Sequence, residues 1–225
     1  DRMTHCFSRR SFLKGSAAAA VLSSPLLPAD AAFSEAENGL FSPVSALCQT
    51  QYGPVKGREG ENGLLCWYGI PYGAAPTGES RWTAPQEPAR WHAVRDCTSP
   101  APAAYQYTTF PLGTEDCLTL DIYSSTEAKK QPVLVYLHGS AATGSSLELP
   151  GCELVRDAGC VFVALNYRLG LFGWNCLPAL TADPDATGSF ALLDIARALD
   201  WVRDNIRRFG GDADNITLCR SEERR

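Results

Sequence analysis

A turn of small residues follows a strand-like apolar run near the middle of the chain. The run PVLVYLHG (132–139) ends at Gly139, and Ser140 and Ala141 come next. Small side chains let backbone N–H groups come close to a bound molecule. Two such donors aimed at one point stabilise the negative oxygen of a tetrahedral reaction intermediate, and losing one donor costs roughly 10²–10³ in rate. The pattern predicts either an oxyanion-binding turn of this kind or an ordinary turn at a strand end.

The nucleophile for such a reaction would be sought in the stretch CRSEERR (219–225), where Ser221 carries the only hydroxyl. A serine hydroxyl attacks weakly unless a neighbouring base takes its proton. After residue 31 the histidines are His92, in an irregular segment, and His138, at the end of the apolar run. Neither is placed beside Ser221 by the sequence. No CxxC pair or histidine cluster has zinc-site spacing, so we expect no metal and no cofactor.

Alternating strands and helices must position these residues. Apolar runs predict strands over 118–124, 132–139, 160–170 and 215–219. The first of them alternates like a half-exposed strand, and the second is apolar throughout, as in a strand buried on both faces. A crossover helix is expected within 145–159, and helical spacing predicts another helix over 191–209. This order indicates an α/β fold with a mostly parallel sheet and flanking helices.

The region before these strands has a different character. Short apolar runs broken by Gly and Pro over 51–75 predict a region of antiparallel hairpins. Residues 76–115 are rich in Pro, Ala and Thr, and we expect a long irregular surface segment there. Residues 33–50 show no clear periodicity and form either a linker or a first strand.

Long motifs along the chain have the order and spacing of a known family. They are YGPVKG (52–57), GIPYGAAP (69–76), RWTAPQEPARW (81–91), EDCLTLDIY (115–123), PVLVYLHG (132–139), NYRLGLFGW (166–174) and the segment 188–218. Together they resemble the type-B carboxylesterases, the cholinesterase-like branch of the α/β-hydrolases. The resemblance implies that residues 50–219 are the N-terminal half of this fold. It also implies hydrolysis of small-molecule carboxylic esters through an acyl-enzyme.

The resemblance also assigns roles to residues. Gly139, Ser140 and Ala141 would form part of the oxyanion hole, where the family usually has glycines. A required positive φ would therefore be strained here, by about 1–3 kcal/mol. In the family the cysteine of the EDC motif forms a disulfide with an upstream cysteine. For Cys117 the nearby candidate is Cys97, and two free thiols are the alternative.

Three further residues are expected to be structural. Family members carry an acid at the position of Asp194, which we expect to form an ion pair rather than to act as a catalytic carboxylate. Arg168 in NYRLG is expected to be a pairing residue as well. Trp201 stands at helical spacing with other apolar residues and is expected in the core.

The nucleophile turn departs from the family most strongly. There the strand ITLC (216–219) is followed by Gly-x-Ser-Ala-Gly, a tight turn in which glycines avoid clashes. In this register Arg220 replaces the first glycine, Glu222 stands at the nucleophile position, and Ser221 comes one residue early. No intact catalytic triad is present, and we expect a frame break over 220–225 and a chain inactive alone. The alternative is a noncatalytic, cholinesterase-like binding or adhesion protein.

The N-terminus has the form of an export signal. Paired Arg9 and Arg10, a weakly apolar run and a small-residue site predict a twin-arginine signal peptide over 1–31. The run is too short, and too interrupted by proline, to span a membrane. We therefore divide the chain into this signal, a linker over 32–49, a partial carboxylesterase domain over 50–219 and an aberrant end over 220–225. The expected destination is the periplasm of a bacterium, or secretion.

Composition restricts the partners. The chain is 45% hydrophobic with a net charge of −5, so it is globular, and its acidic balance argues against nucleic acid. Nine cysteines are many for this length; Cys6 lies in the predicted signal, and the others can be oxidised after export. Their pairing, the identity of the ester and the oligomeric state are left open by the sequence.

Overall fold

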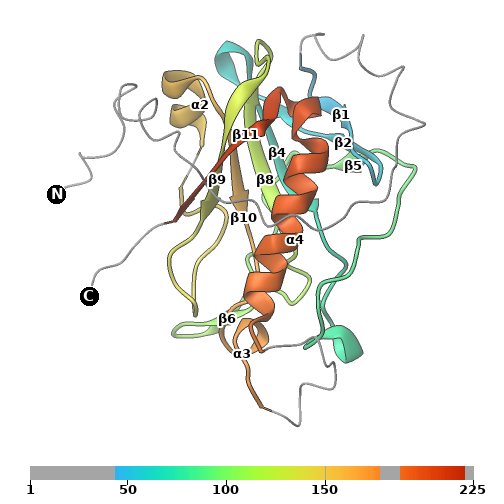
Figure 1. Cartoon of the computed structure of the whole chain (residues 1–225), viewed down its shortest axis with the longest axis vertical. Helices are drawn as coiled ribbons and strands as arrows, with labels where there is room; N and C mark the ends of the chain where they lie inside the picture. Colours follow the sequence, from blue (N-terminus) through green and yellow to red (C-terminus); the bar gives the residue numbers. More distant parts are fainter. Residues whose placement is uncertain (1–43, 150, 178–187, 221–225) are drawn as a thin grey trace, which may run out of the picture. The chain divides into compact units, whose positions relative to one another are not determined.

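A six-stranded sheet with helices on both faces is the centre of the computed structural model, which describes residues 44–149, 151–177 and 188–220 (Figure 1). The strands are β1 (Leu47–Gln49), β2 (Pro54–Lys56), β3 (Arg58–Glu59), β4 (Leu64–Pro71), β5 (Arg95–Asp96), β6 (Gln106–Tyr107), β7 (Pro111–Leu112), β8 (Thr119–Ser125), β9 (Gln131–Leu137), β10 (Val161–Leu165) and β11 (Gly211–Arg220). The helices are η2 (Glu61–Gly63), η3 (Gly78–Ser80), α2 (Cys152–Ala158), α3 (Gly170–Gly173), α4 (Phe190–Asn205) and η4 (Ile206–Phe209).

The large sheet combines a parallel half and an antiparallel half. Its strand order is β11-β9-β10-β8-β4-β3. Strand β9 pairs in parallel with β10 and β11, whereas β8, β4 and β3 pair antiparallel to their neighbours. We expect a mostly parallel sheet from the sequence, but in the described part of the chain only the pairings of β9 are parallel and the sheet is mixed. The expected N-terminal hairpins are present. A separate sheet, β1-β2-β5, begins at Leu47, so part of the range 33–50 is a first strand rather than a linker.

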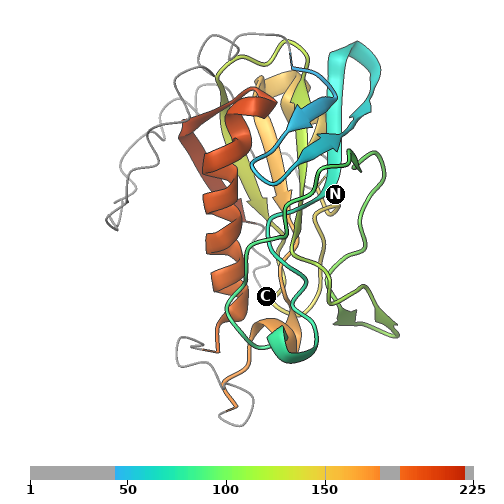
Figure 2. The same cartoon turned by 90° about the vertical axis from the view of Figure 1, so that its right-hand side faces the viewer.

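Each face of the sheet is covered by its own helix (Figures 1 and 2). Because side chains alternate along a strand, Val133 and Val135 of β9 point to one face and Leu134 and Tyr136 to the other. The first pair joins the larger core, with Trp201 and its neighbours on α4. The second pair joins a smaller core with Val155 of α2. The prediction that this run is buried on both faces is confirmed, as is the buried position of Trp201.

Strand β8 is more buried than its alternation suggested. All of its residues except the last are buried, because β8 lies between β10 and β4 and is covered on both sides. Its polar residue Asp121 points inward, and its Oδ1 accepts a hydrogen bond from the N–H of Gly69 at 2.8 Å. Gly69 adopts a positive φ of 66° at a bulge in β4. The prediction of a half-exposed strand was wrong because Asp121 is a polar residue at a buried position, where its Oδ1 is bound by a distant backbone N–H.

The helices and the last strand follow the predicted order with shifted ends. The crossover helix α2 is shorter than the range 145–159, and the predicted helix over 191–209 is α4 continued by the 3₁₀ turn η4. Gly210, with a φ of 85°, ends it in the left-handed conformation. Strand β11 lies at the sheet edge, where Leu218 is 48% exposed. It lies at the edge because, among the described strands, only β9 pairs with β11.

A buried ion pair joins α4 to the loop after β10. Nε and Nη2 of Arg168 donate to the two carboxylate oxygens of Asp194 at 2.8 and 2.6 Å, and both side chains are at most 2% exposed. Nη1 of Arg168 donates to the carbonyls of Arg81 and Thr83 at 3.0 and 2.9 Å. Burial raises the pKa of Asp194, and the hydrogen bonds from Arg168 oppose this shift. The expected structural role of both residues is confirmed.

We predict that Asp194→Ala lowers the free energy of unfolding by about 3–5 kcal/mol, because it leaves the buried guanidinium of Arg168 without its counter-charge. Urea unfolding followed by tryptophan fluorescence measures the loss. Asp200→Ala is the matched control: it removes a carboxylate of the same helix whose pair with Arg203 is exposed, and it should leave the stability nearly unchanged. Equal losses in the two variants would contradict the importance assigned to the buried pair.

Candidate functional site

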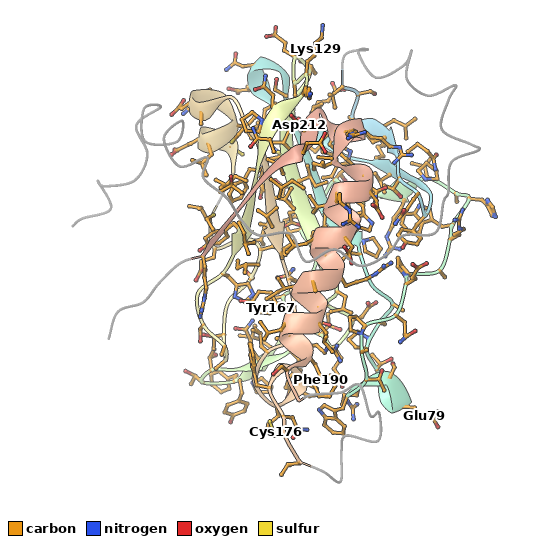
Figure 3. The ribbon with its side chains drawn as sticks, in the orientation of Figure 1. Glu79, Lys129, Tyr167, Cys176, Phe190 and Asp212 are labelled. Atoms are coloured by element: carbon orange, nitrogen blue, oxygen red, sulfur yellow. The ribbon has the colours of Figure 1, made fainter. Side chains whose placement is uncertain are left out.

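The candidate site is the loop 138–148, which follows β9 at the sheet edge where the parallel strands β10 and β11 also end. The carboxyl ends of parallel strands are the usual place for a ligand in an open α/β sheet. Here an open pocket of about 240 Å³ is lined by Ser140, Ala141, Tyr167 and Arg220, with apolar walls from Trp174 and α4. Figure 3 shows Tyr167 behind the ribbon of α4, whose first residue is Phe190.

The backbone amides of this loop are not equally available. The N–H of Gly139 donates to Glu148 Oε2 at 3.3 Å. The N–H groups of Ala142 and Thr143 donate to Ser140 Oγ at 3.1 and 3.3 Å. Within the described part of the chain, the amides of Ser140 and Ala141 have no acceptor. The loop therefore leaves two adjacent donors unoccupied, and both belong to residues that line the pocket.

The loop reaches this conformation without the strain expected from its missing glycines. Among the described residues other than glycine, only Asn62 and Lys130 have a positive φ. Ser140 and Ala141 therefore both occupy backbone conformations that are open to ordinary residues. This conformation of the loop does not require the positive φ that would be strained at these positions.

Charged side chains hold the peptide at Gly139 from both sides. Nη2 of Arg220, at the end of β11, donates to the carbonyl of Gly139 at 2.9 Å. Oε2 of Glu148 accepts the N–H of the same residue and also the hydroxyl of Tyr136 at 2.9 Å. Because the Gly139 carbonyl belongs to the same peptide unit as the Ser140 N–H, these contacts orient one of the two unoccupied donors.

The far end of the loop is anchored by amide side chains. Gln106, on β6, exchanges two hydrogen bonds of 2.9 Å with the backbone of Gly144. Oδ1 of Asn166, after β10, accepts the N–H of Ser146 at 2.8 Å. Sequence reasoning missed Gln106, and it missed Glu148 as well, because neither belongs to a motif and each acts on a residue far along the chain or across the loop.

His138 is a packed residue beneath the loop. Its ring stacks on Tyr167 with centroids 4.3 Å apart, and the Tyr167 hydroxyl donates to the His138 carbonyl at 2.8 Å. Its Nε2 is buried without a hydrogen-bond partner in the described structure. Burial lowers the pKa of His138 to about 4, helped by Arg220 and opposed by Glu148. Gly144 makes room for the ring, because a Cβ there would lie 2.4 Å from Nδ1.

The remaining predicted site residues are not brought together. Cys97 and Cys117 are both buried free thiols, so the disulfide implied by the resemblance is not formed in this structure. Cys97 follows β5, and its N–H donates to the carbonyl of Lys56. Cys117 lines a small cavity together with Arg168. Ser221, Glu222, Arg9 and Arg10 lie outside the described residues.

Comparison with known proteins identifies the family. Residues 44–221 match the carboxylesterase family. The chain belongs to the carboxylesterase family. It is 41% identical to the para-nitrobenzyl esterase of Bacillus subtilis (strain 168) over 181 residues, and 36% identical to the fumonisin B1 esterase of Sphingopyxis macrogoltabida over 182 residues. These alignments cover 75% of this chain and 36% and 33% of the relatives, so the chain spans about a third of their length.

Solved carboxylesterase structures share the fold. A structure of PNB esterase matches 77% of this chain and 37% of its own length, with a TM-score of 0.71 and 40% identity. The Geobacillus stearothermophilus carboxylesterase Est55 matches 78% of this chain and 37% of its own length, with a TM-score of 0.71 and 37% identity. The predicted α/β-hydrolase fold is confirmed.

The N-terminus matches a second known element. Residues 6–24 match the signal sequence of the twin-arginine translocation pathway, which implies export across the cytoplasmic membrane. Within the described ranges, no helix has both the length and the apolar character needed to cross a membrane. The same ranges hold no group of three or more His, Cys, Asp or Glu side chains placed to bind a metal ion.

We predict a pH-dependent loss of stability that depends on His138. The pKa of His138 in the folded protein lies below the ordinary value of 6.5, because burial favours the neutral imidazole. The resulting contribution to the free energy of unfolding is present in full above pH 6.5 and is lost as the pH falls toward 4. Between pH 7.5 and 5 the free energy of unfolding should fall by about 2 kcal/mol through this residue. Urea unfolding across this range should show a smaller pH dependence in His138→Gln than in the unchanged protein. His92→Gln, at an exposed position, is the control and should keep the full dependence.

Proposed function

We propose that this chain is part of a serine carboxylesterase that hydrolyses small-molecule carboxylic esters through an acyl-enzyme. The amides of Ser140 and Ala141 are its oxyanion donors. The observation that carries the proposal is the state of the loop's amides: these two N–H groups have no acceptor in the described structure, and their residues line an open pocket. Oxyanion holes consist of such preorganised backbone donors.

The surroundings of these donors suit an ester with an apolar part. Trp174, Leu192 and Ile195 provide apolar surface in the pocket, while the guanidinium of Arg220 is its charged group. Arg220 is held on the Gly139 carbonyl and adds positive charge near the place where the oxyanion would form. An apolar wall with a few fixed polar groups is the usual composition of a small-molecule site.

The serine of the acyl-enzyme is, in this proposal, not Ser221. The family register puts Glu222 at the nucleophile position. His138, which packs beneath the loop, is also unsuitable as a base, because its pKa of about 4 makes it a weak proton acceptor at neutral pH. The nucleophile position of this sequence therefore carries a carboxylate instead of a hydroxyl, and His138 does not supply the base that ester hydrolysis requires.

A noncatalytic role is the second candidate, and the substitution at the nucleophile turn favours it. Binding at the loop and its pocket does not require a nucleophile, and the described contacts that hold the loop come from Gln106, Glu148 and Arg220. On this alternative the site binds an ester or a related acid without turning it over. In either case the proposed location is the periplasm or the extracellular medium, as the export signal supports.

We predict that a tetrahedral anion such as methylphosphonate shifts the amide resonances of Ser140 and Ala141 in a ¹H–¹⁵N titration. The amides of Ala142 and Thr143 are internal controls, because their hydrogens are already donated to Ser140 Oγ. Their resonances should move much less. Equal shifts along the whole loop, or shifts at the control amides alone, would count against the oxyanion assignment.

We predict that the purified chain hydrolyses p-nitrophenyl acetate no faster than buffer does. Ser221→Ala should leave this result unchanged, and binding of methylphosphonate should also be unaffected. Release of p-nitrophenolate, followed by its absorbance, is the measurement. Turnover that is abolished by Ser221→Ala would show that this serine is the nucleophile and would refute this part of the proposal.

A further inference from the structure

Two cysteines meet on the face of the sheet that α2 covers. Cys66 lies on β4 and Cys152 is the first residue of α2. Cys66 belongs to the small core on this face, and Cys152 and Tyr68 pack against the same core. Cys66 is buried and 5% exposed, whereas Cys152 is half-buried. The two side chains are thus part of one packed cluster although 85 residues lie between them in the chain.

The packing of α2 fixes this contact. Gly151, which precedes the helix, lies so close to the sheet that a Cβ on it would be 2.2 Å from the ring of Phe162. Val155, one turn further along, is buried in the same small core. The start of α2 is therefore pressed against the sheet, and Cys152 stays beside β4 without any covalent link.

We propose that Cys66 and Cys152 form a disulfide when the protein reaches an oxidising compartment. The bond would attach α2 to β4, and with it the peptide segment that leads from the candidate site loop into α2. Export by the twin-arginine route delivers the chain to such a compartment. The inference does not depend on the proposed esterase function.

Two other combinations of described thiols, Cys97 with Cys117 and Cys160 with Cys219, are placed differently. Cys97 and Cys117 have charged groups, not thiols, as their electrostatic neighbours. Cys160 and Cys219 lie on opposite sides of β9, since β10 and β11 both pair with that strand. Two strand spacings amount to about 9.5 Å, more than the roughly 7 Å that a disulfide allows between Cα atoms.

The oxidant is a small disulfide or a protein disulfide of the thiol-oxidase class. Cys152 is the more accessible thiol, so its thiolate attacks one sulfur of the oxidant and releases the first thiol. Cys66 then attacks the sulfur of Cys152, loses its proton and releases the second thiol. The two protein thiols are oxidised and the disulfide of the oxidant is reduced to two thiols. The protons of Cys66 and Cys152 end on these two released thiols. Burial raises the pKa of Cys66 to about 12, so the second step is slow.

The test is oxidation of the purified full chain with oxidised glutathione, followed by non-reducing peptide mapping. We expect a peptide pair that contains Cys66 and Cys152, preceded by a transient glutathione adduct on Cys152. The oxidised protein should melt about 10 °C higher than the reduced protein, because the bond closes a long loop. Cys152→Ser should abolish both the peptide pair and the increase in melting temperature.

Cys117→Ser is the matched control, because it removes a buried thiol that has no thiol neighbour, and it should retain the Cys66–Cys152 peptide pair. Cys152→Ser is preferred to a substitution of Cys66, since a half-exposed position tolerates the change better. The proposal is overturned if Cys66 and Cys152 both remain free after oxidation, or if Cys97 and Cys117 are joined instead. A failure of the esterase assay or of the anion titration has no effect on this result.

Discussion

The buried ion pair between Arg168 and Asp194 is the interaction on which the site depends most. It fixes the loop after β10 to α4, and through the carbonyls of Arg81 and Thr83 it fixes the long irregular segment to the same point. Two residues further along, the N–H of Gly170 donates to the carbonyl of Ala141 at 2.9 Å. Fold and site are therefore coupled, because a shift of the Arg168 loop would displace Ala141, the residue that carries one of the two unoccupied donors.

The two faces of the sheet contribute differently to this arrangement. The face under α4 is a continuous apolar core and supplies most of the buried surface, so the driving force for folding is concentrated there. The face under α2 carries polar and sulfur-containing groups, among them Asp121, Cys66 and Tyr123. Such groups require specific partners when buried, and this face therefore fixes the position of individual segments rather than adding stability in proportion to its area.

Much of the fold was accessible from the sequence, and most of the contacts at the site were not. Strands β9 and β10 and helix α4 were predicted because apolar runs and helical spacing reflect burial directly. Strand β8 was read as half-exposed because Asp121 interrupts its apolar pattern, and the burial of that carboxylate depends on Gly69, far away in the sequence. The oxyanion residues could be named from a motif, but Gln106 and Glu148 could not, since their effect arises only when distant segments are folded together.

In this loop serine and alanine stand in place of glycine, and two backbone N–H groups are still available as donors. A glycine-rich turn leaves its amides free because no side chain competes for them. Here Ser140 introduces a competing acceptor, yet its Oγ takes the amides of Ala142 and Thr143, which lie beyond the donor pair. Glu148 takes the amide that lies before the pair. The side chains of Ser140 and Glu148 thus accept hydrogen bonds from the amides on either side of the pair, and they leave the amides of Ser140 and Ala141 available. The availability of a backbone donor therefore depends on which amides the nearby side-chain acceptors bind, and not on the presence of glycine.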